Sequence, residues 1–269
     1  SEAIARGDVN AINYFVAQKY VEAFAELARI RSERETYFPF AVGDGSRQEL
    51  RVYRDHGFAS VLDPYLPGTK VMPLRSWHRL VERIPFDTVA LDASPEVGPF
   101  DLLKIDIQGG ECEVFRGARQ ALKGAVAVIV ELRYFRLYEG EPMMGGVDCD
   151  LRGQGFELHR FRFNKSRALA NSQSNRLRHN HVRDQLVDGD AIYVRDITRK
   201  EVMSDGQLAH LAVLASAATA VTIPNLIGAA VSAARWRPDH WLLIENGRVA
   251  GVQAEAPPDG WYDTGDLGY

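Results

Sequence analysis

The sequence has little of what marks a secreted or membrane-spanning protein. Its 269 residues contain two cysteines, Cys112 and Cys149, which are too few for a disulfide framework and lack the spacing of a metal-ligand pair. No apolar run reaches the length needed to cross a membrane, and the N-terminus lacks the basic and apolar stretches of a signal peptide. These absences predict a cytoplasmic protein without a membrane span.

Strong charge of one sign is also absent. The net charge is -4 and charged residues make up 25% of the chain, so the sequence gives no electrostatic reason to expect nucleic acid as a partner. His179 and His181 have no nearby set of Asp or Cys ligands, so they do not predict a metal site. A hydrophobic content of 46% is sufficient for a full core.

Short apolar runs alternate with helical patterns over the first two thirds of the chain. The run at 125–132 is almost entirely apolar, which is typical of a strand covered on both faces of a parallel sheet. The order of the patterns predicts an open α/β sheet with mostly parallel strands. The predicted strands are 11–17, 37–42, 49–53, 102–107, 125–132, 156–163 and 191–195, the predicted helices are 20–31 and 113–122, and 57–73 reads as a loop.

The last part of the chain has a different pattern. Ser204 and Gln207 have the spacing of a capping box, which predicts a helix that Pro224 later interrupts. Asn246-Gly247 lies between two apolar arms and predicts a β-hairpin.

Two domains follow from these patterns. We predict one α/β domain over 1–195 and a helical and hairpin appendage over 196–269. The hairpin would leave a strand edge exposed, and such an edge could pair with a second copy of the chain in a homo-oligomer.

One stretch, DLLKIDIQGGECEVF at 101–115, carries the strongest chemical signal. An apolar strand ends in Asp106, and an acid in that position costs free energy unless it is paired or used. The next strand in sequence brings Glu131 to its carboxyl end, and the carboxyl ends of parallel strands meet at the edge where ligands bind. Two carboxylates there can serve as a general base or as metal ligands toward a substrate hydroxyl. Asp106 and Glu131 are therefore the candidate catalytic residues.

These residues resemble the FkbM-type methyltransferases, which are class I S-adenosylmethionine enzymes. The family's hallmark is a strand reading roughly K-I-D-V-Q-G-x-E, then a helix with Gly-Ala, then a strand ending in an acid. The resemblance implies S-adenosyl-L-methionine as cofactor and O-methylation of a hydroxyl on a sugar, glycan or glycosylated metabolite. The matching segments are KIDIQGGE at 104–111, Gly117-Ala118, VIVE at 128–131, AVGDGS at 41–46, SVLDP at 60–64 and DAIYVRD at 190–196.

The resemblance also implies roles for further residues. We assign cofactor contacts to Gln18, Val42, Asp44, Asp106 and Gln108, and substrate contacts to Gln108, Glu111, Arg133 and Tyr138. Other interpretations stay open: Glu111 can instead complement the helix dipole, and Asp44 can be an ordinary turn acid.

A basic segment over 159–183 is a further candidate. It could form a lid for an anionic glycan or a phosphate-bearing substrate, or it could simply be solvated. Its charged residues are His159, Arg160, Arg162, Lys165, Arg167, Arg176, Arg178, His179, His181 and Arg183.

A glycine-rich loop is missing where the resemblance requires one. The strand at 11–17 aligns with the family's second strand, and Gly7 is the one glycine before it. Val16 or Gln18 stands where an acid should bind the cofactor ribose. The chain could be a fragment of a longer enzyme, the second and fourth strands of the fold could pair directly, or another chain could fill the gap.

The predicted fold is therefore a Rossmann-like class I methyltransferase sheet, mostly parallel and incomplete at its N-terminal strand, with a C-terminal appendage. A methyltransferase is the first functional hypothesis. A catalytically inactive relative that serves as a binding or scaffold protein in glycan biosynthesis is the alternative.

Overall fold

The structure is a computed structural model, and it describes residues 11–14, 38, 40–72, 77–173, 176, 183–217, 241–245 and 248–253. The strands are β1 (Ala11–Tyr14), β2 (Ala41–Gly43), β3 (Arg47–Tyr53), β4 (Leu80–Ala90), β5 (Leu102–Ile105), β6 (Ala127–Arg133), β7 (Phe156–Arg167), β8 (Gln185–Arg195), β9 (Trp241–Glu245) and β10 (Arg248–Gln253). The α-helices are α3 (Leu66–Val71), α4 (Glu111–Arg116), α5 (Ala121–Gly124), α6 (Met144–Gly153) and α7 (Asp205–Ala217). Short 3-10 helices cover His56–Phe58 (η1), Leu91–Ala93 (η2), Pro95–Val97 (η3) and Ile197–Val202 (η4).

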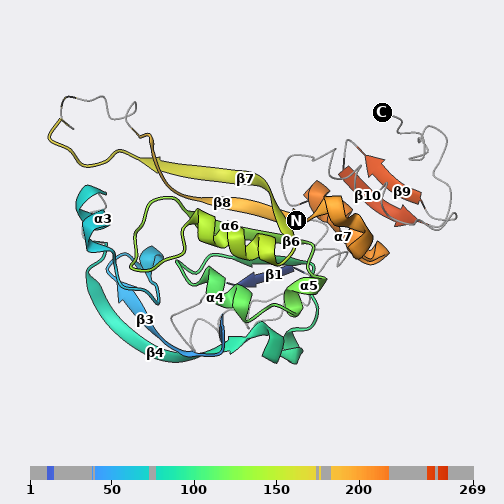
Figure 1. Ribbon diagram of the computed structural model, residues 1–269, viewed down its shortest axis with the longest axis horizontal. Helices are drawn as coiled ribbons and strands as arrows, with labels where there is room; N and C mark the ends of the chain where they lie inside the picture. Colours follow the sequence, from blue (N-terminus) through green and yellow to red (C-terminus); the bar gives the residue numbers. More distant parts are fainter. Residues whose placement is uncertain are drawn as a thin grey trace.

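A five-stranded sheet in the order β1-β5-β6-β8-β7 forms the centre of the molecule (Figure 1). β1, β5 and β6 are parallel, whereas β8 is antiparallel to both β6 and β7. Among these five strands β8 alone is therefore reversed. The mixed α/β class predicted from the sequence is confirmed, and its Rossmann-like details stay a prediction.

β1 pairs directly with β5. Ala11 lies opposite Leu102 and Tyr14 lies opposite Ile105, with no strand between them. This ladder satisfies the backbone groups along that side of β5. Of the three explanations for the missing glycine loop, direct pairing of the family's second and fourth strands is the one that this ladder matches.

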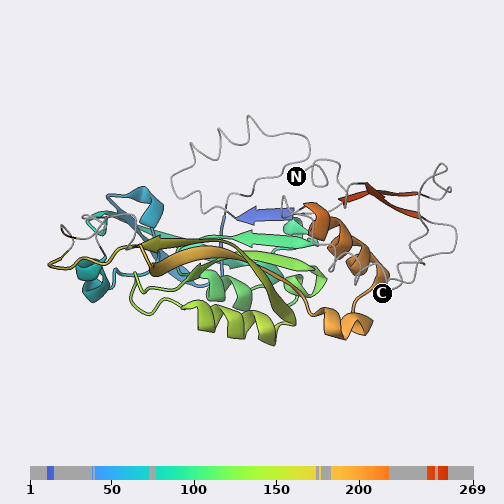
Figure 2. The same ribbon diagram turned by 90° about the horizontal axis from the view of Figure 1, so that it is seen from above.

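The two faces of the central sheet differ in chemistry. Helices α4 and α6 lie on one face (Figure 2), where Leu103, Val130 and Tyr193 belong to the main apolar core. Because successive side chains along a strand point to opposite faces, the neighbouring residues project from the other face. That second face carries Lys104, Asp106, Glu131, Arg133, Asp188 and Asp190.

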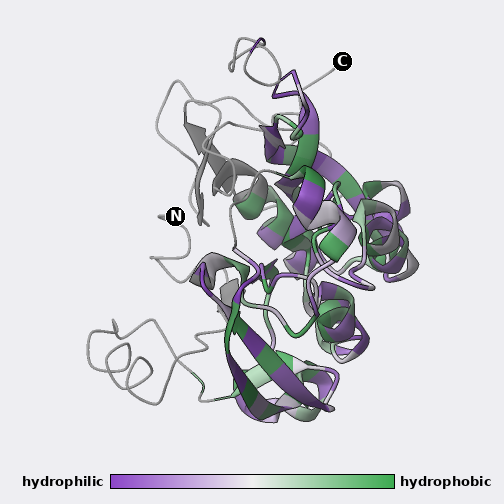
Figure 3. Cartoon of the chain, turned by 90° about the vertical axis from the view of Figure 1, so that its left-hand side faces the viewer, coloured by the Kyte–Doolittle hydropathy of each residue, from purple (hydrophilic) through white to green (hydrophobic). Residues whose placement is uncertain are grey.

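A smaller sheet, β2-β4-β3, was only partly predicted. β3 and β4 are antiparallel, and Figure 3 shows hydrophilic and hydrophobic bands alternating along the long strands in the lower part of the molecule. The sequence patterns gave no indication of β4 or α6. The segment 57–73 is not wholly a loop, because α3 forms there with a proline in its first turn, where no backbone N–H is needed.

The predicted helix at 113–122 is instead two short helices. Gly117 lies between them, and a Cβ added at this position would lie 2.3 Å from the carbonyl oxygen of Gly43. This close contact presses the end of α4 against the end of β2, and only a residue without a side chain fits there.

The capping box before α7 is confirmed. Ser204 N donates to Gln207 Oε1 (3.0 Å), and Gln207 N donates to Ser204 Oγ (3.2 Å). β9 and β10 pair as the predicted hairpin, while its Asn246-Gly247 turn and the segment around Pro224 lie outside the described residues. The domain boundary after residue 195 stays a prediction. No helix in the described ranges is long and apolar enough to cross a membrane.

Candidate functional site

The turn after β5 is held by its own side chains. Gln108 has a φ of 58° and Gly109 a φ of 108°, so two successive residues are in the left-handed region. The carboxylate of Glu111 accepts hydrogen bonds from Ile107 N (3.1 Å) and Gly109 N (3.0 Å). Glu111 is buried, which raises the pKa of its carboxyl group. Glu111 therefore stabilises the turn, and its contact with substrate stays a prediction.

The loop at 60–64 packs against this turn. Ser60 Oγ donates to the carbonyl oxygen of Gln108 (2.6 Å) and accepts from Leu62 N (3.0 Å). A Cβ at Gly109 would lie 2.8 Å from Leu62 Cδ1, the end of a flexible side chain, and the φ of 108° is the stronger reason for a glycine at this position. Ser60 was noted in the sequence only as part of SVLDP; the structure gives it a definite role in holding Gln108.

The side chain of Gln108 joins the two predicted catalytic carboxylates. Its Nε2 donates to Asp106 Oδ1 (2.9 Å) and to Glu131 Oε2 (2.7 Å). Its Oε1 accepts from Arg133 Nη2 (3.0 Å) and, more weakly, from the Tyr138 hydroxyl (3.4 Å). The structure thus brings together five of the residues singled out in the sequence, from the ends of β5 and β6 and the loop after β6.

Arg133 lies at the centre of a group of acids. It is 6% exposed, and its guanidinium contacts Glu131 (2.9 Å), Asp188 (3.3 Å) and Glu141 (3.4 Å). Burial alone would lower the pKa of Arg133, but Glu131 and Glu141 outweigh burial and raise it. The predicted substrate contacts of Arg133 and Tyr138 stay predictions, since both side chains are buried within the network.

Two of these acids were missed in the sequence. Asp188 belongs to VDGDAIYV in β8, where two acids lie two residues apart in an apolar strand. Burying an unpaired acid costs free energy, so this pattern in the sequence predicts that both acids have a partner or a function. Glu141 follows no motif. It is identified only by the structure, where it accepts from the backbone N–H groups of Leu137 and Tyr138 (the latter 3.0 Å).

The carboxyl group of Glu131 is poised to exchange a proton near neutral pH. Burial raises its pKa to about 8, with Arg133 opposing the shift and Asp106 adding to it. Among the described residues, the hydrogen bonds to Glu131 all end on Oε2. Oε1 is therefore the oxygen that remains to accept a proton.

The predicted cofactor residues are spread over a longer surface. Asp44 follows β2 and lies beside Gly117, which ends α4, and its charge raises the pKa of Glu113; Asp106 comes before the N-terminal end of α4. α4 itself has six residues and is about 9 Å long. Hydrogen bonds from Ser46 lower the pKa of Asp44 and keep it charged. Val42 is buried in the core, and Gln18 lies outside the described residues.

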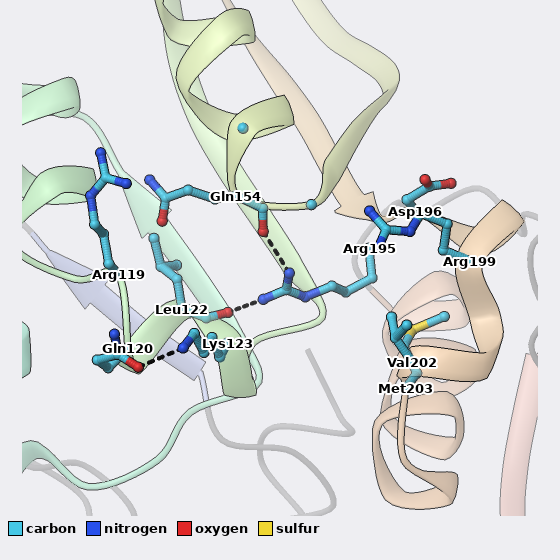
Figure 4. Close-up of a pocket in the computed structure, with 12 residues that line it drawn as sticks. Arg119, Gln120, Leu122, Lys123, Gln154, Arg195, Asp196, Arg199, Val202 and Met203 are labelled. Carbon is cyan, nitrogen blue, oxygen red and sulfur yellow. Dashed lines mark hydrogen bonds between the residues drawn. The ribbon is translucent and has the colours of Figure 1, made fainter.

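A hollow of about 450 Å³ lies at the opposite edge of the sheet (Figure 4). Its centre is Arg195, which donates to the carbonyl oxygens of Leu122, Ala125 (2.8 Å) and Gln154 (2.7 Å) and stacks on Phe156 at 4.1 Å. These carbonyls lie at the C-terminal ends of α5 and α6, which favour a cation. Burial lowers the pKa of Arg195 to about 10. The hollow is a helix junction rather than part of the carboxylate site.

Metal-binding geometry is not found in the described ranges: no group of three or more His, Cys, Asp or Glu side chains there could hold an ion. His179 and His181 lie outside those ranges. The carboxylates of this site accept hydrogen bonds from the nitrogen atoms of Gln108 and Arg133.

Comparison with known proteins identifies the family. Neither a curated protein nor a solved structure matches the chain. The family model described as the methyltransferase FkbM domain matches residues 7–158, which is more than half of the chain and includes the β5 turn, Glu131 and Glu141. The resemblance of the KIDIQGGE segment is thereby confirmed, and the chain belongs to the FkbM methyltransferase domain family.

Proposed function

We propose that this protein is an S-adenosylmethionine-dependent O-methyltransferase acting on a hydroxyl of a sugar, glycan or glycosylated metabolite. The observation that carries the proposal is Glu131, whose carboxyl group lies beside Asp106 and has a pKa of about 8. A hydroxyl must lose its proton as it gains a methyl group, and a base with a pKa near the working pH serves this step best.

The described residues fit S-adenosylmethionine in charge. Asp106 is a half-buried acid at a strand end, suited to a cationic sulfonium, and Asp44 stays charged and can accept hydrogen bonds at the other end of α4. When bound, this cofactor supplies an electrophilic methyl group and leaves as a neutral thioether that keeps the electron pair of the broken carbon–sulfur bond.

The chain's own residues provide the acid–base part of the reaction. Glu131 in its ionised form takes the hydroxyl proton on Oε1, so the acceptor oxygen forms its new bond to carbon without a positive charge. Arg133 and Gln108 hold Oε2 and so fix the direction of Oε1. The base is then restored when Glu131 loses this proton to solvent.

Isothermal titration with S-adenosylhomocysteine tests cofactor binding. We expect a single site, and no heat at high micromolar concentration would remove the basis for the enzymatic proposal. Asp106→Asn should lower methyl transfer strongly, because it removes the charge at the strand end. Full activity of this variant would contradict the role assigned to Asp106.

A catalytically inactive binding or scaffold protein is the second candidate, and the β1–β5 ladder favours it. Direct pairing of these strands occupies the place where the family resemblance implies a further strand with its glycine loop. The same titration separates the two candidates, since a scaffold need not bind S-adenosylhomocysteine but should still bind its glycan partner.

A further inference from the structure

The strands β7 and β8 extend the polar face of the sheet past the carboxylates. They have 12 and 11 residues against seven in β6, and in Figure 1 they continue well beyond the other strands. In β8, Asp190 lies opposite Glu131 of β6 on one side and opposite Phe163 of β7 on the other. The three side chains therefore form one row on this face.

Phe163 is joined to the carboxylate network by an unbroken series of contacts. The ammonium of Lys165 lies 5.5 Å from the centre of the Phe163 ring and 2.9 Å from Asp188 Oδ1. Asp188 Oδ2 in turn contacts Arg133, which holds Glu131. The ring is 44% exposed, so a large apolar surface faces solvent at the border of a charged site.

The charges around the ring favour a neutral ligand with hydroxyl groups. Lys165 faces Asp188, and Arg162 lies 3.7 Å from Asp190, so both cations of this part of β7 face acids. An anionic ligand would meet these carboxylates, and an apolar ligand would remove water from the ion pairs without offering a hydrogen bond in exchange. A hydroxyl both donates and accepts, and therefore suits a wall on which acids and cations alternate.

We infer that Phe163 is the stacking platform for the ring of a sugar acceptor, whose hydroxyls are read by Asp190, Arg162 and Lys165. This inference rests on the proposed function and adds to it the residues that choose the acceptor. Phe163 and Asp190 lie beyond residues 7–158, so this wall is outside the part of the chain that the family model matches. It also lies on the side of the sheet away from β1.

Phe161 offers a matched control. It is 36% exposed, but it pairs with Ala191 of the apolar core face and makes an edge contact with Tyr134, with ring centres 6.2 Å apart. Phe161 and Phe163 thus have the same chemistry and similar exposure, on opposite faces of one strand.

The test measures binding of methyl pyranosides in the gluco, galacto, manno and rhamno series by ligand-observed NMR, with S-adenosylhomocysteine present. We expect at least one to bind the native chain. Phe163→Ala should weaken it roughly three- to tenfold, Phe163→Trp should retain it, and Phe161→Ala should leave it within about twofold.

Three results would overturn the inference: no pyranoside bound by the native chain, equal weakening in both alanine variants, or no change in Phe163→Ala. Titration of each variant with S-adenosylhomocysteine keeps the proposed function separate. Loss of that affinity in Phe163→Ala would place the ring against the cofactor instead and would also reject the platform, whereas intact affinity with no sugar bound would reject the platform alone.

Discussion

Two arginines, the buried Arg133 and the half-buried Arg195, end adjacent strands of one ladder and have different kinds of partner. Arg133 ends β6 and Arg195 ends its antiparallel partner β8, so they lie at opposite edges of the sheet. Arg133 is surrounded by carboxylates, whereas the hydrogen bonds described for the Arg195 side chain go to backbone carbonyls. Accordingly the pKa of Arg133 is raised and that of Arg195 is lowered to about 10.

The difference separates the proposed reactive site from a structural junction. Carbonyl groups do not titrate, so the junction at Arg195 keeps the same charge at any pH well below the Arg195 pKa of about 10. The acids around Arg133 can each hold or release a proton, and burial has moved the pKa of Glu131 to about 8. The titratable partners of Arg133 make its surroundings a candidate for acid–base chemistry, whereas the carbonyl partners of Arg195 serve packing.

The largest expected effect is on catalysis at the Arg133 end. Glu131→Gln keeps the shape of the side chain but removes the base, so methyl transfer should fall about 10²- to 10⁴-fold. The measurement is the initial rate of S-adenosylhomocysteine release with an acceptor that supports turnover. Arg199→Gln, an exposed change at the wall of the opposite hollow, should have no effect. A nearly normal rate in Glu131→Gln would remove Glu131 from the mechanism.

The loss of stability on replacing each arginine by alanine should depend on pH for Arg133 but not for Arg195. Arg133→Ala leaves several buried carboxylates without a cation and should cost about 3–5 kcal/mol at pH 8. Arg195→Ala leaves carbonyl groups without a donor and should cost about 2–4 kcal/mol. Lowering the pH to 5 protonates Glu131, whose pKa is about 8, so the cost of Arg133→Ala should fall while that of Arg195→Ala stays constant. Urea unfolding at both pH values measures the free energy of unfolding of each variant. The same pH dependence in both variants would contradict the difference proposed between the two arginines.

The pH dependence of the native protein follows from Glu131 itself. Its folded pKa of about 8 exceeds its ordinary value of 4.5, so the folded state binds the proton more tightly than the unfolded state. Its contribution to stability is therefore complete below about pH 4.5 and is lost as pH rises through about 8. Melting temperatures should fall over that window, and less steeply in Glu131→Gln. The transfer rate should rise with pH and level off above about pH 8, so a rate that falls there would contradict the base assignment.

The smallest effect concerns Gln108. Its φ of 58° strains any residue that has a Cβ, but not glycine. Gln108→Gly should therefore be more stable than Gln108→Ala by about 1 kcal/mol. Both variants lose the bridge between Asp106 and Glu131, and both should lose activity equally. Thermal unfolding compares the pair; equal stability would show that this backbone conformation carries no strain.

The sequence was sufficient for the strand–turn–helix unit and for the closeness of Asp106 to Glu131, because parallel strands place their ends at one edge. It was not sufficient for the surroundings of Arg133, since Glu141 comes from a segment without a recognisable motif and the acids of β8 indicate a buried partner without saying which one. Nor could it show that position 117 needs a glycine, because the reason is a close approach to Gly43, which is distant in sequence. Contacts of this kind are fixed only when separate elements pack.

The position of Arg195 at the end of β8 also bears on how the chain avoids misfolding. A slip of β8 by two residues would preserve the alternation of apolar and polar faces, and it would put Asp190 in place of Asp188 opposite Arg133. An acid would therefore lie opposite Arg133 in both the native and the shifted register. The contacts of Arg195 differ between the two registers, because the slip would move it roughly 7 Å from the carbonyls it binds. The contacts of Arg195 thus favour the native pairing of β8 with β6, which places Asp188 opposite Arg133 at the other end of the strands.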